Sequence, residues 1–195
     1  MWSLILQTIG WAACIVYATI PAFWLLIHRH VDYWRSLPRS PYRVLLPLWI
    51  AMWIALGLIT ARWRTLSFYS TAWTWIPAAF FFATGFWIYK NSTREFSGTQ
   101  FGGVHELQPE QHEQRLVTSG IRSQVRHPVY LAHLCEMLAW SIGTGLAVCY
   151  GLTAFGVITG AIMIRLEDAE LEQRFGQQYR DYRRRVPAVI PSLRI

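Results

Sequence analysis

Residues 119–133 read SGIRSQVRHPVYLAH and mark the point where a long polar segment meets an apolar run. Arg126, His127 and Tyr130 stand at the edge of that run, and His133 lies inside it. Pro128 suits the first turn of a helix, where the missing N–H leaves no hydrogen bond unmade. The stretch therefore predicts that a helix begins at Pro128 and carries polar side chains from the boundary into the apolar region.

The chain around this stretch has the composition of a membrane protein. It has 195 residues, 53% of them hydrophobic, and includes 11 Trp. A helical span needs about 20 mostly apolar residues. Such runs lie at about 2–27, 44–61 and 72–89, and the run at 128–164 is long enough for two short spans with a turn near 143–151. We therefore expect an all-α, polytopic transmembrane bundle of about five spans, with the last two as a tight hairpin.

The polar segments divide this single domain into functional parts. Residues 1–89 hold three N-terminal spans, residues 90–127 form a long polar loop, residues 128–164 form the hairpin, and residues 165–195 form a charged tail that begins as a helix. The segment at 28–43 is expected to be a loop. A polar segment as long as 90–127 is uncommon in a compact bundle unless it has a function.

Basic residues near the span ends predict the orientation of the chain. The segments at 28–43, 90–127 and the tail are rich in Arg, and cytoplasmic loops of membrane proteins carry this excess. The expectation is an integral membrane protein with its N-terminus outside and its C-terminus in the cytosol. The N-terminal run lacks the basic start of a signal peptide, which favours a retained span and a bacterial inner membrane.

Several functional classes do not fit the sequence. The net charge of +7 is distributed between apolar runs, so it indicates contact with membrane lipids and no nucleic acid. The histidines match no zinc spacing, so no metal site is expected. The cysteines, Cys14, Cys135 and Cys149, are expected to be buried apolar residues. GTQFGG at 98–103 lacks the strand and helix of a dinucleotide-binding fingerprint.

Ionisable residues within the apolar run are candidates for function. Tyr130, His133 and Glu136 are spaced three residues apart and share one broad face of a helix. Such groups are costly in a membrane interior and commonly mark a polar site. Arg126, His133 and Glu136 are the candidate catalytic residues, with His133 or Glu136 as a base if the acceptor carries a proton. A pair that only holds helices together remains an alternative.

Two longer stretches carry a family resemblance. RLVTSGIRSQVRHPVY at 115–130, an acidic pair at 167–168 and FGQQYRDYRRRVPAVIP at 175–191 follow one another in order. This series, within residues 107–191, resembles the isoprenylcysteine carboxyl methyltransferase family and the related phospholipid N-methyltransferases. Its signature elements are LVT-x-G, R-H-P-x-Y, the acidic pair and F-G-x-x-Y-x-x-Y.

The resemblance implies a small membrane enzyme that transfers the methyl group of S-adenosylmethionine to a lipophilic or lipidated acceptor. It also implies a cofactor pocket between the loop, the tail and the last two spans. The residues that it places there are Gln114, Arg115, Leu116, Val117, His127, Pro128, Val129, Tyr130 and Glu167. Arg126 is expected to pair with the cofactor carboxylate, and backbone groups before Pro128 to hold the adenine edge.

The sequence departs from the family pattern at three positions. Arg122 replaces a frequent aromatic residue, and Asp168 replaces the second Glu of the acidic pair. The arginine that in the family contacts the prenylcysteine carboxylate falls on Met163, which argues against that carboxylate as the acceptor. A phospholipid-like amine stays open, as do two alternatives: a membrane sterol or enone reductase with a nicotinamide cofactor, and a non-catalytic scaffold.

Overall fold

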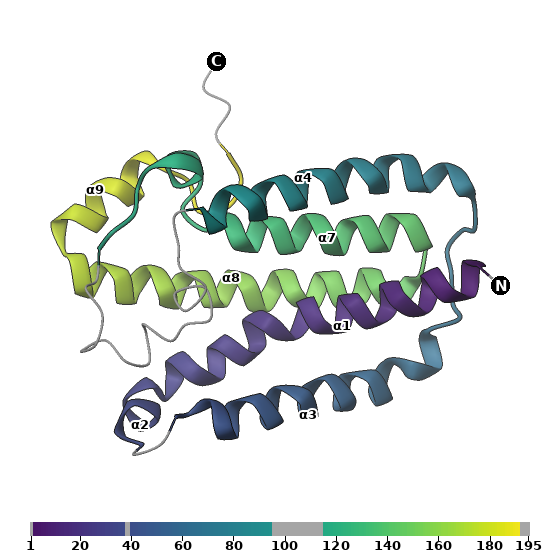
Figure 1. The fold of residues 1–195 in the computed structure, drawn as a ribbon, viewed down its shortest axis with the longest axis horizontal. Coiled ribbons are helices and arrows are strands. Elements are labelled where there is room, and N and C mark those ends of the chain that lie inside the picture. The colour runs from purple at the N-terminus through teal and green to yellow at the C-terminus, as the bar shows by residue number, and fades with distance from the viewer. Residues whose placement is uncertain (1, 38–39, 95–114, 192–195) are drawn as a thin grey trace.

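The computed structural model describes residues 2–37, 40–94 and 115–191, and these fold into a bundle of helices (Figure 1). The long helices are α1 (Trp2–Arg29), α3 (Tyr42–Thr60), α4 (Trp75–Thr93), α7 (Pro128–Thr144) and α8 (Ala147–Phe175). The short helices are α2 (Val31–Ser36) and α9 (Gln177–Arg185), with 3-10 turns at Ala61–Trp63, Ala72–Thr74 and Gly120–Ser123. The all-α prediction is confirmed.

Helices α1, α3 and α8 are long and apolar enough to cross a membrane. Helices α4 and α7, which the sequence also placed in the membrane, lie alongside them (Figure 1). Helix α7 has 17 residues, which gives a length of about 26 Å, slightly less than a hydrocarbon core of about 30 Å. The chain is therefore an integral membrane bundle, and the crossing of α4 and α7 stays a prediction.

The apolar surface of the bundle supports this assignment. Large apolar side chains on the outside of α3, α4 and α8, such as Leu58, Phe80 and Ile158, are exposed. Exposed apolar surface on this scale is unusual for a soluble monomer but is what lipid requires. The interior is apolar as well: Cys14 and Ala18 of α1 pack against Met137 of α7 and Leu152 of α8.

Helix α1 is central to the packing, because it contacts α3, α7 and α8, while α4 packs against α7. The segment at 28–43, expected to be a loop, instead contains α2. The expectation was wrong there because Val31 and Trp34 pack beside Phe23, Ile27 and Leu45, which stabilises one short amphipathic helix.

The final two long helices form the expected hairpin, with its turn at Gly145. Gly145 has φ 67° and its N–H donates to the carbonyl of Ser141. Only glycine adopts this left-handed conformation without strain. Ser67 pairs with Leu146 in an isolated antiparallel bridge, which ties the 62–71 link to the turn. Helix α8 then continues past the apolar region to Phe175, as the sequence predicts.

Replacing Gly145 with Ala should destabilise the protein by about 1–2 kcal/mol, because an L-residue is strained at positive φ. The added Cβ would also meet Tyr69. The measurement is the thermal midpoint of unfolding in detergent. Gly151→Ala is the matched control, since Gly151 lies in a helix and a Cβ there has nothing within 4 Å. Equal midpoints for the two variants would contradict this account of the turn.

Candidate functional site

A polar site lies at the end of the bundle where α7 begins and the second half of α8 meets α9 and the C-terminal tail (Figure 1). His127 occupies the position directly before α7, and Pro128 occupies the first turn as predicted. Gly176, with φ 54°, separates α8 from α9 and lets the chain turn back toward α7. Because the hairpin is tight, the start of α7 and the acidic pair of α8 face each other.

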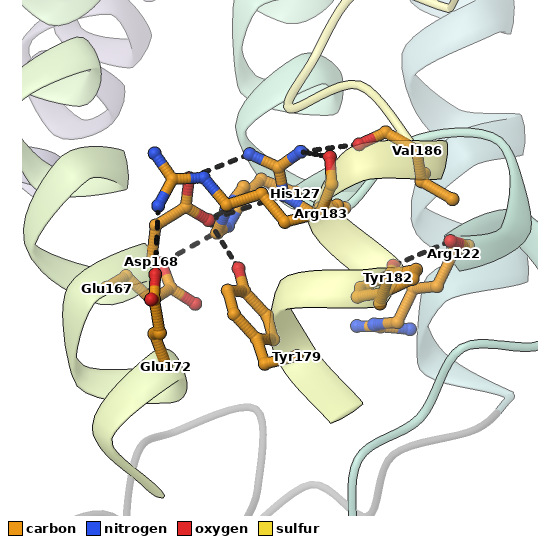
Figure 2. A network of polar contacts seen from close by, with 10 residues as sticks. Arg122, His127, Glu167, Asp168, Glu172, Tyr179, Tyr182, Arg183 and Val186 are labelled. Atoms are coloured by element: carbon orange, nitrogen blue, oxygen red, sulfur yellow. Dashed lines mark hydrogen bonds and ion pairs between the residues drawn. The ribbon is translucent and has the colours of Figure 1, made fainter. Parts of the chain in front are cut away.

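The centre of the site is the buried carboxylate of Asp168. Nη2 of Arg126 lies 2.7 Å from Oδ2, and Nε2 of His127 lies 2.8 Å from Oδ1. The phenol of Tyr179 donates a short hydrogen bond to Oδ1. The Asp168 side chain is 6% exposed, so its charge is compatible with burial only because these donors surround it. Figure 2 shows His127 from just before α7, Asp168 from α8 and Tyr179 from α9 converging.

Glu167 completes the acidic pair from the other side of His127. Its Oε2 lies 3.4 Å from Nδ1 of His127, so the imidazole stands between two carboxylates. The Glu167 side chain is 28% exposed, in contrast to Asp168. Glu167 is therefore the member of the pair that keeps surface available for a ligand.

The carboxylates set the charge of the groups around them. Burial opposes the charged imidazole, but Glu167 and Asp168 outweigh it and raise the pKa of His127 to about 9. Burial and the hydrogen bond to Asp168 both raise the pKa of Tyr179. At neutral pH His127 is thus an imidazolium that donates on both nitrogens, and Tyr179 is a neutral donor.

The C-terminal tail locks the start of α7. The N–H of Arg126 donates to the carbonyl of Pro187 and the N–H of His127 to that of Ala188, each at 2.9 Å. Nη1 of Arg126 donates to the carbonyls of Val186 and Arg183. These N–H groups were expected to hold an adenine edge, and in this structure they are already paired with the tail.

The polar loop before α7 is fastened to α9. The phenol of Tyr182 donates to the carbonyl of Arg122 at 2.6 Å (Figure 2). Leu116 packs against the buried cluster of Tyr179, Tyr182 and Val186. A hollow at this end is lined by Thr118, Ser123, Gln124, Tyr182, Arg185, Val186, Pro187 and Pro191. Loop, α9 and tail thus form one concave surface with both polar and apolar lining.

The structure brings most of the predicted site residues to this end. Arg115 is exposed, Val117, Val129 and Tyr130 are partly buried, and Pro128 is buried. The ring of Tyr130 lies 6.0 Å from that of His127. Gln114 lies outside the described residues. His133 and Glu136 lie deeper in the bundle, as expected, with His133 buried and Glu136 partly buried.

The structure also gives partners to residues to which the sequence analysis assigned no role. Glu170 contacts His28 of α1 and Arg174, each at 2.7 Å. Tyr179 was part of a quoted motif but had no assigned role. The spacing of Tyr179 and Tyr182 on one face of α9, with Val186 directly after its end, was the signal that could have shown their burial.

The fold and the site together define an integral-membrane helical protein with a buried charged network at one bundle end. No family model matches the chain, and no solved structure matches it. The chain is 35% identical over 100 residues to protein-S-isoprenylcysteine O-methyltransferase B of Arabidopsis thaliana. The matched region covers 49% of this chain and 48% of that protein. The chain is 29% identical over 154 residues to protein-S-isoprenylcysteine O-methyltransferase of Rattus norvegicus, which covers 74% of this chain and 50% of that protein.

These relatives carry the name of the isoprenylcysteine carboxyl methyltransferase family, which the sequence resembles. The human protein-S-isoprenylcysteine O-methyltransferase is 32% identical over 108 residues, 50% of this chain and 34% of that protein. The resemblance identified from the sequence is thus confirmed. The chain spans about half the length of the first curated relatives that it matches.

Replacing Asp168 with Asn should destabilise the folded protein by about 3–5 kcal/mol, because the buried Arg126 would lose its carboxylate and His127 would lose one of its two. The thermal midpoint of unfolding in detergent measures the effect. Glu172→Gln is the control on the same helix: Glu172 pairs with Arg180 and Arg183 at the surface, and such exposed pairs contribute about 0–1 kcal/mol. A midpoint for Asp168→Asn as high as that of the control would contradict the central role of Asp168.

Proposed function

We propose that this protein is an integral-membrane methyltransferase that uses S-adenosylmethionine and modifies a lipophilic or lipidated acceptor. The observation that carries the proposal is the contact of His127 with Glu167 and Asp168, at 3.4 and 2.8 Å. It joins the R-H-P-x-Y segment to the acidic pair, which are the motif elements of the family. The names of the relatives support methyl transfer, and these comparisons do not support the reductase or scaffold alternatives.

The residues at the bundle end fit the chemistry of S-adenosylmethionine. This molecule carries an ammonium, a carboxylate and ribose hydroxyls, and it supplies a methyl group activated by a sulfonium. Glu167 keeps a partly exposed carboxylate, which can accept hydrogen bonds from an ammonium or from hydroxyls. Arg115 is exposed at the start of the described loop and can face a carboxylate. Leu116, Val117, Val129 and Tyr130 can supply apolar and aromatic contact.

Arg126 and His127 have a different task in this proposal. Arg126 is 7% exposed and is committed to Asp168 and the tail, so we assign it to positioning rather than to direct contact with the cofactor. The imidazolium of His127 orients the Glu167 carboxylate by contacting its Oε2 atom, on the side away from the proposed cofactor. Since methyl transfer neutralises a sulfonium and creates no large new charge, this alignment should provide most of the catalysis.

Membrane chemistry explains why the site lies at a bundle end. Polar groups without partners are costly in hydrocarbon, so a soluble methyl donor must approach from water. The acceptor must approach from lipid. We propose that this end faces the cytosol, since the described basic residues around α2 and in α9 lie there (Figure 1). The bacterial inner membrane stays a prediction.

The acceptor is the finer part of the proposal. The names of the relatives refer to S-isoprenylcysteine, which favours a lipidated substrate. Met163 is buried in α8, at the position where the family's carboxylate-binding arginine is expected. An acceptor that presents something other than that carboxylate, such as a phospholipid-like amine, is consistent with this difference.

Replacing Glu167 with Gln should weaken the binding of S-adenosylmethionine about 10-fold or more, since hydrogen bonds to a charged group contribute about 1.5–3 kcal/mol. Isothermal titration calorimetry in detergent measures it. Glu172→Gln removes the same charge five residues further along α8 and should bind normally. Unchanged affinity of the Glu167 variant would remove this residue from the cofactor site.

Methyl transfer itself can be tested with S-adenosylmethionine that carries an isotopic methyl label. The wild-type protein in nanodiscs should transfer the label to a lipid-soluble product when it is supplied with a membrane lipid extract or with a prenylated cysteine. Mass spectrometry of the product identifies the modified atom. A copurifying nicotinamide dinucleotide, or no affinity for either cofactor, would overturn the proposal in favour of the reductase or the scaffold.

A further inference from the structure

His133 is a buried polar residue in the interior of the bundle that the cofactor site does not use. Its side chain lies on α7 with 8% exposure. Within residues 2–37, 40–94 and 115–191, its Nδ1 atom is buried and has no hydrogen-bond partner. Most buried polar atoms in proteins are paired, and an ionisable residue inside a membrane bundle commonly marks a site. The unpaired nitrogen therefore calls for a hydrogen-bonding partner that the described residues do not supply.

Tyrosine rings from three helices surround this imidazole. The ring centroid of His133 lies 5.3 Å from that of Tyr17 on α1, 5.4 Å from that of Tyr89 on α4, and 6.4 Å from that of Tyr130 on α7. Tyr17 and Tyr89 are partly buried and keep some surface at the outside of this cluster. The cluster is thus polar and aromatic in a region whose other packing is apolar.

Glu136 adds a carboxyl group on the same helix, and the shape of α4 accommodates it. A Cβ at Gly85 of α4 would lie 2.7 Å from Oε1 of Glu136, so the missing side chain of Gly85 leaves room for the carboxyl. Glu136 is also only partly buried. A carboxyl group at this depth is expensive unless it has a polar partner, which is a second reason to expect a ligand group here.

The cluster is continuous with the site at the bundle end. The rings of His127 and Tyr130 lie 6.0 Å apart, and those of Tyr130 and His133 lie 6.4 Å apart. His133 lies six positions after His127, which corresponds to about 9 Å along a helix axis. Tyr130 therefore connects the polar end, where Glu167 lies, to the interior cluster.

We propose that His133, Tyr17, Tyr89 and Glu136 bind the polar end of the methyl acceptor, and that they select a head group that donates a hydrogen bond and carries no negative charge. This inference rests on the proposed function. A neutral imidazole has one acceptor nitrogen, which a hydroxyl or an amine can satisfy. The carboxyl of Glu136 disfavours a second carboxylate beside it, while a donor can bind between the carboxyl and the tyrosines.

Probes of one chain length and different head groups test this selection. Dodecylamine, dodecanol and dodecanoate are titrated into the full chain in nanodiscs of zwitterionic lipid, with histidine labelled by ¹⁵N. The amine and the alcohol should shift the ring nitrogen resonances of His133 and saturate. Dodecanoate should bind about 10-fold more weakly or not at all, the loss expected when one buried hydrogen bond is replaced by repulsion.

Matched variants assign the effect to the cluster. His133→Phe, which keeps an aromatic ring of similar size, should reduce amine and alcohol binding about 10-fold. His30→Phe changes an exposed histidine and should bind as the wild type does. Should His133→Phe fail to fold, Glu136→Gln serves in its place, and it should reduce the preference for the amine over dodecanoate.

The outcomes separate this inference from the proposed function. Dodecanoate binding as tightly as the amine, or full binding by His133→Phe, overturns the assignment of the cluster. Selective binding of the amine and alcohol supports it even in a protein that transfers no methyl group, because the titration contains no cofactor. Loss of methyl transfer alone would then count against the enzyme and not against the binding site.

Discussion

The buried carboxylate of Asp168 is the interaction on which the geometry of the bundle end depends. Its ligands come from separate parts of the chain: Arg126 and His127 precede α7, and Tyr179 lies on α9. A buried charge with fewer donors would be costly, and one fully surrounded by donors fixes its neighbours in position. The single carboxylate thus joins the polar loop, the hairpin and the C-terminal helix into one unit.

That unit leaves a division of labour between adjacent acids. The carboxylate of Asp168 is bound by Arg126, His127 and Tyr179. Glu167 contacts His127 on one side and remains partly exposed. The same imidazolium serves both acids, because each of its nitrogens can donate. In the proposed enzyme, this charged network would hold the Glu167 carboxylate in position for a cofactor that arrives from water. The rings of Tyr130 and His133 connect this site to the interior of the bundle.

The order of residues in the chain was enough to predict much of this arrangement. Pro128 after an Arg-His pair indicated where α7 begins, and the apolar run that follows indicated a hairpin that would return the acidic pair to the same end. The helix α2 within the segment at 28–43 was harder to predict, because it depends on packing against Phe23 and Leu45. These contacts with neighbouring helices cannot be read from the segment's own sequence. The helical continuation of α8 to Phe175 followed from its charged but uninterrupted composition.

By itself the sequence determined the class of fold, the membrane character, the family resemblance and the residues available for a site, since apolar run length, helical spacing and motif order are local properties. Only the tertiary structure decided how those residues are paired. It assigned Arg126 to Asp168 and to the tail carbonyls, Glu170 to His28, and Tyr179 to the buried carboxylate. The physical reason is that hydrogen bonding and burial depend on which helices meet in space, and a linear pattern does not specify the partner that each polar atom finds.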